Sequence, residues 1–101
     1  MEAWLARAAR LHGERTALRV GGDDLTYAEL FGRARAVAGA LLDRGLRPGD
    51  RVALAMPSEP LVVALHGCLL IGAVAVPIDL RLREGERAVR TQGAAVILSS
   101  D

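Results

Sequence analysis

Residues 48–79 decide the fold, and they read PGDRVALAMPSEPLVVALHGCLLIGAVAVPID. The turn Pro48-Gly49-Asp50 leads into an apolar run without alternation, from Val52 to Met56. Such a run is typical of a strand that is covered on both faces, as in a parallel sheet. A helix is predicted to follow, with Ser58 as its cap candidate, continuing to Ile71 and ending at Gly72.

The rest of the segment and its continuation predict two further strands. Ala73–Ile78 reads as a second apolar strand, a polar helix is predicted over about 83–92, and Val96–Ser99 reads as a third strand. Two successive right-handed crossovers would make a parallel sheet of three strands with helices packed on it. The sequence therefore predicts the α/β class, with an open edge at Val96–Ser99 that other backbone should cover.

The first 45 residues predict a helix, a hairpin and a longer helix. Trp4–Leu11 reads as a short amphipathic helix with Trp4, Leu5, Ala8 and Leu11 on one side, and Gly13 is expected to stop it in the left-handed conformation. Residues 16–20 and 24–25 flank the turn Gly21-Gly22-Asp23, which indicates a small hairpin.

The longer helix has the clearest start signal in the chain. Thr26 and Glu29 form a capping-box pattern, and Gly45 is expected to end the helix in the left-handed conformation. One face repeats at helical spacing and is predicted to be the core face: Tyr27, Leu30, Phe31, Ala34, Val37, Ala38, Leu41 and Leu42.

Length and composition exclude several classes of protein. The chain has 101 residues, 51% hydrophobic and 25% charged, which allows one small globular domain and excludes a two-domain enzyme. All 13 basic residues are arginine and are scattered against 12 acidic ones, so nucleic-acid binding has no support. The chain contains no lysine, so no step that needs a lysine amine can come from it. With one cysteine and no secretory signal, the cytoplasm is the expected compartment.

The apolar stretch Leu61–Ile78 approaches the length of a membrane span, with His66 as its only polar side chain. Gly67 and Gly72 weaken a continuous helix there, and Pro77 would break it. A buried helix followed by a buried strand is therefore predicted in place of a membrane span.

No constellation of residues carries catalysis or binds a metal by its spacing. His66 and Cys68 lie two apart and would point to different faces of a helix, which is unsuited to zinc. We expect His66 to be a core or subunit-contact residue and Cys68 a small buried hydrophobe. The acidic pairs Asp23-Asp24 and Glu84/Glu86 are expected to be solvated, and neither G-x-G-x-x-G nor G-x-x-x-x-G-K-[ST] occurs. These residues alone specify no function.

Three motifs do resemble a known family. Residues 25–30 read L-T-Y-A-E-L, residues 48–53 read P-G-D-R-V-A, and residues 69–79 read L-L-I-G-A-V-A-V-P-I-D. In this order they resemble motifs of the adenylate-forming, AMP-binding enzymes: acyl-CoA synthetases, luciferases and the adenylation domains of peptide synthetases. The resemblance implies that residues 1–101 are a partial N-terminal subdomain, part of the large domain of an adenylate-forming ligase.

The resemblance also implies a reaction. Trp4–Ala8, Ala64–Leu70 and the stretch from Arg81 to Glu86 are most similar to the ligases that attach o-succinylbenzoate to CoA in menaquinone biosynthesis, while the generic Pro77-Ile78-Asp79 leaves other acyl- or aryl-CoA ligases open. The full enzyme would use ATP, Mg²⁺, CoA and a small carboxylic acid, and none of these is expected to bind this piece well.

The family's phosphate loop, magnesium-holding acid, ribose-binding aspartate and lid lysine have no counterpart in these residues, so we expect no catalytic residue here and no activity from the piece alone. Arg81 is the one candidate ligand contact, to a CoA phosphate. The expected partner is the remainder of the ligase chain. The alternative is a freestanding, non-catalytic α/β module that binds a partner or dimerises through its open sheet edge.

Overall fold

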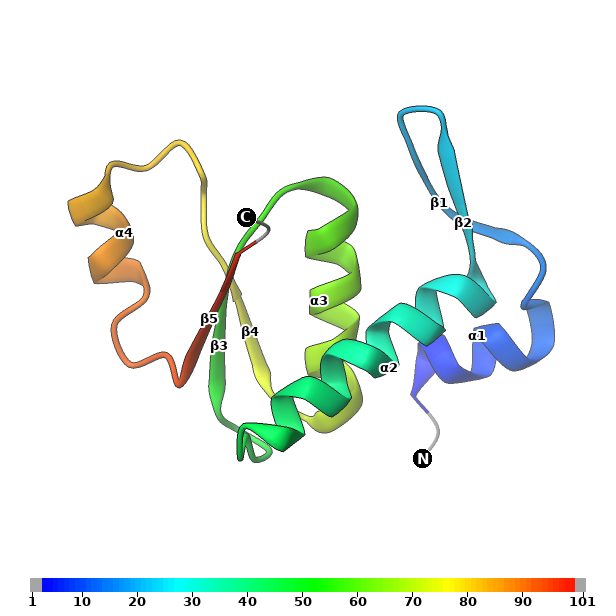
Figure 1. Ribbon diagram of the computed structural model, residues 1–101, viewed down its shortest axis with the longest axis horizontal. Coiled ribbons are helices and arrows are strands. Elements are labelled where there is room, and N and C mark those ends of the chain that lie inside the picture. The colour runs from blue at the N-terminus through cyan, green and yellow to red at the C-terminus, as the bar shows by residue number, and fades with distance from the viewer. Residues whose placement is uncertain (1–2, 100–101) are drawn as a thin grey trace.

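Two small sheets and their connecting helices make up the computed structural model, which describes residues 3–99. In chain order the elements are α1 (Trp4–His12), β1 (Thr16–Val20), β2 (Asp23–Thr26), α2 (Tyr27–Asp43), β3 (Arg51–Ala55), α3 (Ser58–Ile71), β4 (Val74–Pro77), α4 (Glu84–Arg90) and β5 (Val96–Ser99). Helix α1 and the β1–β2 hairpin lie at one end, the other sheet and α4 lie at the opposite end, and α2 runs between them (Figure 1).

The predicted parallel sheet is confirmed, with strand order β4-β3-β5 and β3 parallel to both neighbours. Val52 and Leu54 of the central strand are fully buried and belong to a cluster with residues of α3. Because side chains alternate along a strand, Ala53 and its register partners Val76 and Ile97 point to the opposite face. The chain is therefore an α/β protein whose central strand is its most buried segment.

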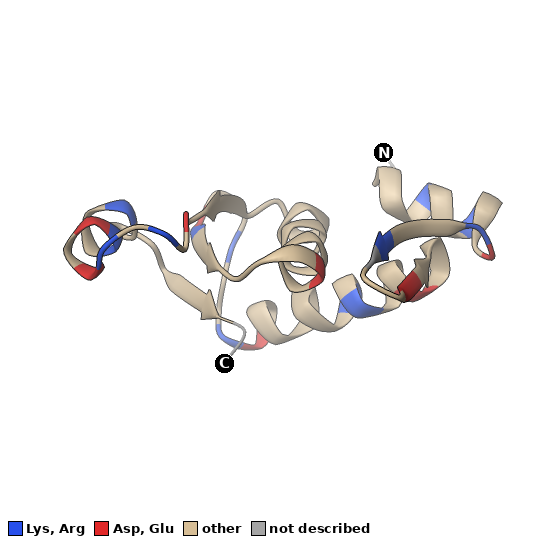
Figure 2. Ribbon diagram, turned by 90° about the horizontal axis from the view of Figure 1, so that it is seen from above, with Lys and Arg blue, Asp and Glu red and all other residues tan. Residues whose placement is uncertain are grey.

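The second face of the sheet is open in the described part of the chain. The side chains of Val74 and Ile97 are 45% and 56% exposed. Helix α4 makes no extensive contact with any other described element and stands apart from the sheet (Figures 1 and 2). The helices that flank the sheet are α3, which packs on β3, and α2, whose Leu41 joins the same core cluster.

Helix α2 begins as predicted, at a complete capping box. Thr26 Oγ1 accepts from the Glu29 amide at 3.1 Å, and Glu29 Oε1 accepts from the Thr26 amide at 2.9 Å. Leu30, Ala34, Ala38 and Leu41 form its buried face, which packs extensively on α3. Leu42 was predicted on this face but is 53% exposed, because its position turns it away from α3.

At two helix ends the predicted interactions are wrong, namely a left-handed stop and a side-chain cap. Gly13 is right-handed, with φ −54°, so it does not stop α1 in the left-handed conformation. A glycine is needed there for space, since a Cβ would lie 2.6 Å from the Ala9 carbonyl oxygen. Ser58 makes no capping hydrogen bond and lies inside the first turn of α3 at φ 52°, after Pro57 in the cap position.

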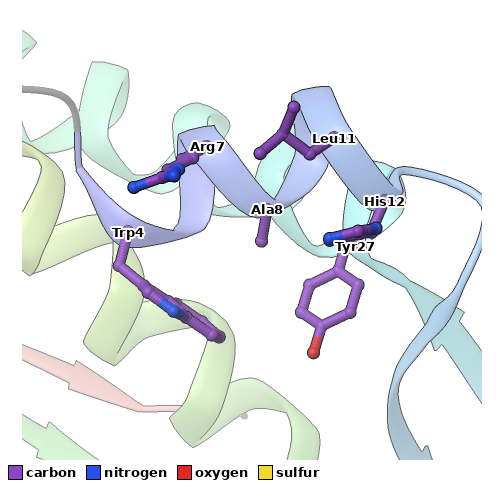
Figure 3. A pocket seen from close by; sticks show the side chains of 6 residues that line it. All are labelled: Trp4, Arg7, Ala8, Leu11, His12 and Tyr27. Atoms are coloured by element: carbon purple, nitrogen blue, oxygen red, sulfur yellow. The ribbon is translucent and has the colours of Figure 1, made fainter.

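The predicted inward side of α1 is also only partly correct. Leu5 is buried, but Trp4 and Leu11 are 64% and 51% exposed. Leu5 packs in a cluster with residues of α2 and α3, whereas Trp4 and Leu11 lie outside that cluster. The Trp4 ring still meets Tyr27 of α2 edge-on (Figure 3) and stacks on His66 of α3.

The contact between α2 and α3 predicts a steric effect at Gly67. A Cβ added there would lie 2.8 Å from Val37 Cγ1, 2.9 Å from Val37 Cβ and 3.1 Å from the Ala34 carbonyl oxygen. We expect Gly67→Ala to lower the free energy of unfolding by about 1 kcal/mol or more, despite the better helix propensity of alanine. Urea unfolding followed by circular dichroism measures this.

Gly39→Ala, in the middle of α2, is the matched control. A Cβ at Gly39 meets nothing within 4 Å, so this variant should be more stable by about 0.5–1 kcal/mol. Equal stability changes in the two variants would contradict a close helix contact at Gly67.

Candidate functional site at the carboxyl edge of the sheet

The carboxyl ends of the three parallel strands define the candidate site. Open parallel sheets bind ligands outside these ends, at the point where the strand order reverses. Here β3 is followed by residues 56–57 and β4 by residues 78–83, and the chain then crosses to the other side of β3 to form β5. Ile78 is held at this edge by its amide, which donates to the Leu54 carbonyl oxygen at 2.9 Å.

Asp79 and Arg81 form a hydrogen-bonded pair in the loop after β4. Asp79 Oδ1 accepts from the Arg81 amide at 2.9 Å and from Arg81 Nε at 3.1 Å, and Asp79 Oδ2 accepts from Arg81 Nη2 at 3.0 Å. The Leu82 amide donates to the Asp79 carbonyl oxygen at 3.1 Å, which tightens the same turn. The loop is thus shaped by one aspartate that engages both the backbone and the side chain of the arginine two residues on.

A second arginine ties this loop to α4. Arg87 Nη2 donates to the Leu80 carbonyl oxygen, while Arg87 Nε is buried without a hydrogen-bond partner among the described residues. Hydrogen bonds from the Arg81 side chain and backbone, with a smaller contribution from the charge of Arg87, lower the pKa of Asp79 from 3.8 to about 2. Asp79 therefore stays ionised through the whole physiological range.

The exposure and the hydrogen bonds of Arg81 affect its suitability as the candidate phosphate contact in opposite directions. Its side chain is 90% exposed, so a ligand can reach it, but Asp79 already occupies two of its nitrogens. An incoming phosphate would have to share the guanidinium with the carboxylate or displace it, because both anions use the same donors.

The other residues weighed from the sequence do not join this edge. His66 stacks on Trp4, with ring centroids 6.0 Å apart and planes 24° apart, and burial lowers its pKa. Cys68 is fully buried in the core, as predicted, and burial raises the pKa of its thiol. Asp24 pairs with Arg19 on the hairpin, so the predicted solvation of the Asp23-Asp24 pair holds only in part.

The edge offers no evident magnesium site of its own. Within residues 3–99, no three His, Cys, Asp or Glu side chains lie close enough to hold a metal ion, and the one carboxylate at the loop, Asp79, is taken by Arg81.

Sequence reasoning missed the two partners that shape the loop. In the sequence, Asp79 ends the third motif and Arg87 lies within the polar helix predicted over about 83–92, and neither position indicates a partner. The spacing of Asp79 and Arg81, two apart directly after a strand, is the local signal that indicates such a turn. Nothing local could have indicated Arg87, because its contact with Leu80 depends on the direction in which α4 leaves the loop.

Comparison with known proteins places this fold in a family. Residues 5–98 match the family described as AMP-binding enzyme. The chain belongs to the AMP-binding enzyme family. A feruloyl-CoA synthase of an Amycolatopsis species is 42% identical over 99 residues, which cover 95% of this chain and 20% of that protein. A 2-succinylbenzoate–CoA ligase of Bacillus licheniformis is 34% identical over 90 residues, which cover 88% and 19%.

Solved structures agree with this assignment. The unliganded o-succinylbenzoate coenzyme A synthetase of Bacillus subtilis superposes with a TM-score of 0.91 and 31% identity, covering 100% of this chain and 23% of that one. The same enzyme in complex with ATP and a magnesium ion gives a TM-score of 0.91 and 30% identity, covering 100% and 28%. The chain spans about a fifth of the length of the curated AMP-binding relatives named above.

In the stretch from residue 3 to residue 99, none of the helices is both long and apolar enough to cross a bilayer.

The paired loop predicts the titration of Asp79. Because its folded pKa is depressed, its contribution to stability is complete above the ordinary value of 3.8 and is lost as the pH falls through about 2. Nuclear magnetic resonance titration of the side-chain carboxyl should give a pKa of about 2 in the native chain. In Arg81→Ala the midpoint should move up toward 3.8. An unchanged midpoint would show that Arg81 does not hold the carboxylate.

Proposed function

We propose that this chain is the N-terminal part of an ATP-dependent, AMP-forming acid–CoA ligase. The observation that carries the proposal is the match over the whole chain: it superposes at a TM-score of 0.91 on a coenzyme A synthetase of which it covers only 23%. Residues 1–101 would then be a partial subdomain of a longer AMP-binding domain. The exposed second face of the sheet supports this, because parallel sheets are normally covered on both faces.

The proposed ligase reaction has two steps, formation of an acyl-adenylate and formation of the CoA thioester. The substrate carboxylate attacks the α-phosphorus of ATP, forming an acyl-adenylate and releasing pyrophosphate. The thiol of CoA then attacks the acyl carbon, forming the thioester and releasing AMP and a proton. The first step concentrates negative charge on the phosphates, and a chain without lysine supplies no amine to stabilise it.

The role of this region is to build the scaffold. Central strand β3 and helix α3 provide a rigid core, and the loop after β4 carries Arg81 at the ligand-binding edge of the sheet. We propose that the 101 residues by themselves catalyse neither step. ATP–pyrophosphate exchange by the isolated chain should equal the background rate, whereas the complete polypeptide should show acid-dependent exchange. Acid-dependent exchange by the isolated chain would overturn the assignment of catalysis to the rest of the enzyme.

We propose an aryl-bearing carboxylic acid as the substrate class, with o-succinylbenzoate as the first candidate. The solved relatives named above are o-succinylbenzoate synthetases, while the feruloyl-CoA synthase has the higher sequence identity, 42% against 34% for the succinylbenzoate ligase. Both names describe aromatic acids. Thioester formation by the complete enzyme should be compared with o-succinylbenzoate, ferulate and a straight-chain fatty acid. Preference for the fatty acid would contradict the proposed class.

We further propose that Arg81 contacts a phosphate of CoA. Its 90% exposed side chain and its position after β4 support this. Replacing it with alanine in the complete enzyme should raise the KM for CoA by about tenfold, the loss of one charge-assisted hydrogen bond, and leave the KM for ATP unchanged. Arg19→Ala is the matched control, because Arg19 is also exposed and paired with an aspartate, but on the distant hairpin. An equal CoA requirement in both variants would contradict a role for Arg81.

The alternative function is a freestanding module that binds a partner or a second copy through the open edge of β5. Among the described residues β5 is the last strand of the order β4-β3-β5 and has no partner on its outer side, which favours this alternative. Sedimentation velocity over a range of concentrations distinguishes the two functions. A module predicts one defined oligomer, whereas a piece of a ligase predicts ill-defined, concentration-dependent association.

A further inference from the structure

Arg87 joins helix α4 to the loop after β4. Its Nη2 atom donates to the Leu80 carbonyl oxygen, and within residues 3–99 this is the one side-chain hydrogen bond between α4 and that loop. Helix α4 has seven residues, no side-chain cap and no extensive contact with another described element (Figure 1). The position of α4 relative to the loop therefore depends on few contacts, and Arg87 supplies one of them.

No ion pair holds the Arg87 side chain in place. Glu84 and Glu86 lie on the same helix, yet among the described residues no acid forms a salt bridge with Arg87. The Nε atom of Arg87 is buried without a hydrogen-bond partner, and burial of an unpaired donor is unfavourable. Buried unpaired donors are rare in native proteins and often mark a constraint other than stability.

The Leu80 carbonyl oxygen belongs to the same peptide group as the Arg81 amide. Arg87 donates to the oxygen of this group, and the amide of the group donates to Asp79 Oδ1 at 2.9 Å. Because a peptide group is planar, hydrogen bonds at both of its ends fix its rotation about the chain. The Cα atom of Arg81 is bonded to this group, so the two hydrogen bonds together set the direction in which the Arg81 side chain leaves the loop.

The backbone hydrogen bonds of this peptide group do not involve the Arg81 guanidinium. An anion that draws the guanidinium away from Asp79 breaks the bonds from Nε and Nη2, but the bonds from the Arg81 amide and from Arg87 can remain. Hydrogen bonds from Arg81 lower the pKa of Asp79 most, and the charge of Arg87 lowers it further. Arg87 therefore holds the loop, and keeps a positive charge near Asp79, whether or not Arg81 has turned to a ligand.

We propose that Arg87 is a positioning residue, which fixes the Leu80–Arg81 peptide group so that Arg81 meets a phosphate of CoA in a set orientation. Arg87 acts through Arg81 and not by contact with CoA. The inference rests on the proposed contact between Arg81 and CoA, and it adds a second arginine on which the affinity for CoA depends.

Replacing Arg87 in the complete polypeptide tests whether it holds the loop. Arg87→Met keeps an aliphatic stem and removes the donors, while Arg87→Lys keeps a cation and a donor. In Arg87→Met, hydrogen–deuterium exchange measured by mass spectrometry should be about tenfold faster in the peptide that covers residues 79–83, because the loop loses one of its two holds. Arg87→Lys should exchange at a rate between those of Arg87→Met and the native protein.

Steady-state kinetics separate a positioning role from a merely structural one. We expect Arg87→Met to raise the KM for CoA by about threefold, less than Arg81→Ala does, because the Arg81 guanidinium is still present. The kcat and the KM for ATP should not change. The melting temperature should stay near the native value, since water can replace the lost donor at Leu80, which is 37% exposed, and the variant removes a buried unpaired Nε.

A double variant shows whether Arg87 acts through Arg81. When Arg81→Ala and Arg87→Met are combined, the KM for CoA should equal that of Arg81→Ala alone. Two residues that contribute independently would instead give additive effects.

Two control variants remove arginines that do not hold the loop. Arg90→Met changes an exposed arginine in the last turn of the same helix, α4. Arg7→Met changes an exposed arginine of α1, at the other end of the molecule (Figures 1 and 3). Both should show native exchange over residues 79–83 and a native KM for CoA.

Three results would overturn the proposal. The first is native exchange over residues 79–83 in Arg87→Met. The second is an equal rise in the KM for CoA in Arg87→Met and Arg90→Met, which would assign the effect to charge alone. The third is an additive rise in the double variant, which would mean that Arg87 does not act through Arg81.

Failure of the proposed CoA contact gives a different result. Arg81→Ala would then have a native KM for CoA, which refutes the contact whatever the hydrogen exchange shows. Faster exchange in Arg87→Met would in that case still establish Arg87 as the residue that holds the loop.

Discussion

The close packing of α3 between α2 and the sheet holds this molecule together. Ala64 and Cys68 on one side of α3 join the cluster around Val52 and Leu54, while Val63 on another side joins the cluster around Leu30 and Ala34. Gly67 lets the two helices approach so closely that a Cβ at this position would clash with the side chain of Val37. A helix that is buried on two sides must be apolar nearly all round, which is why this segment resembles a membrane span in sequence.

In the loop after β4, one side chain shapes the candidate ligand-binding edge and also limits it. Asp79 orders the turn by accepting from the Arg81 backbone and side chain, and Arg87 holds the following carbonyl. The same interactions neutralise the arginine that is best placed to meet a phosphate. If Arg81 contacts a phosphate as proposed, that phosphate would exchange with Asp79 as its partner, and the strength of binding would depend on how readily Asp79 releases the guanidinium.

The two ends of the molecule present different surfaces. Among the residues that the structure describes, the parallel sheet at one end has exposed apolar side chains on one face and no outer partner for β4 or β5, which agrees with the proposed piece of a protein about five times as long. At the other end α1 is already anchored through Leu5, yet it exposes Trp4 and Leu11 beside Arg7. The first surface is apolar, as in a fold's interior, whereas the second places exposed apolar side chains beside an arginine.

The sequence by itself determined the order and type of the elements, because each depends on local pattern: the apolar runs of β3 and β4, the capping box at Thr26 and the helix stop at Gly72. It also indicated the family through three motifs. Only the tertiary structure decided that a glycine is needed at position 13 because a Cβ has no room there, and not because the turn is left-handed. It also decided that Leu42 and Trp4 are exposed and that Asp79 and Arg87 both hold the loop after β4. These outcomes depend on which elements lie against each other, and helical or strand periodicity carries no information about a neighbour distant in the chain.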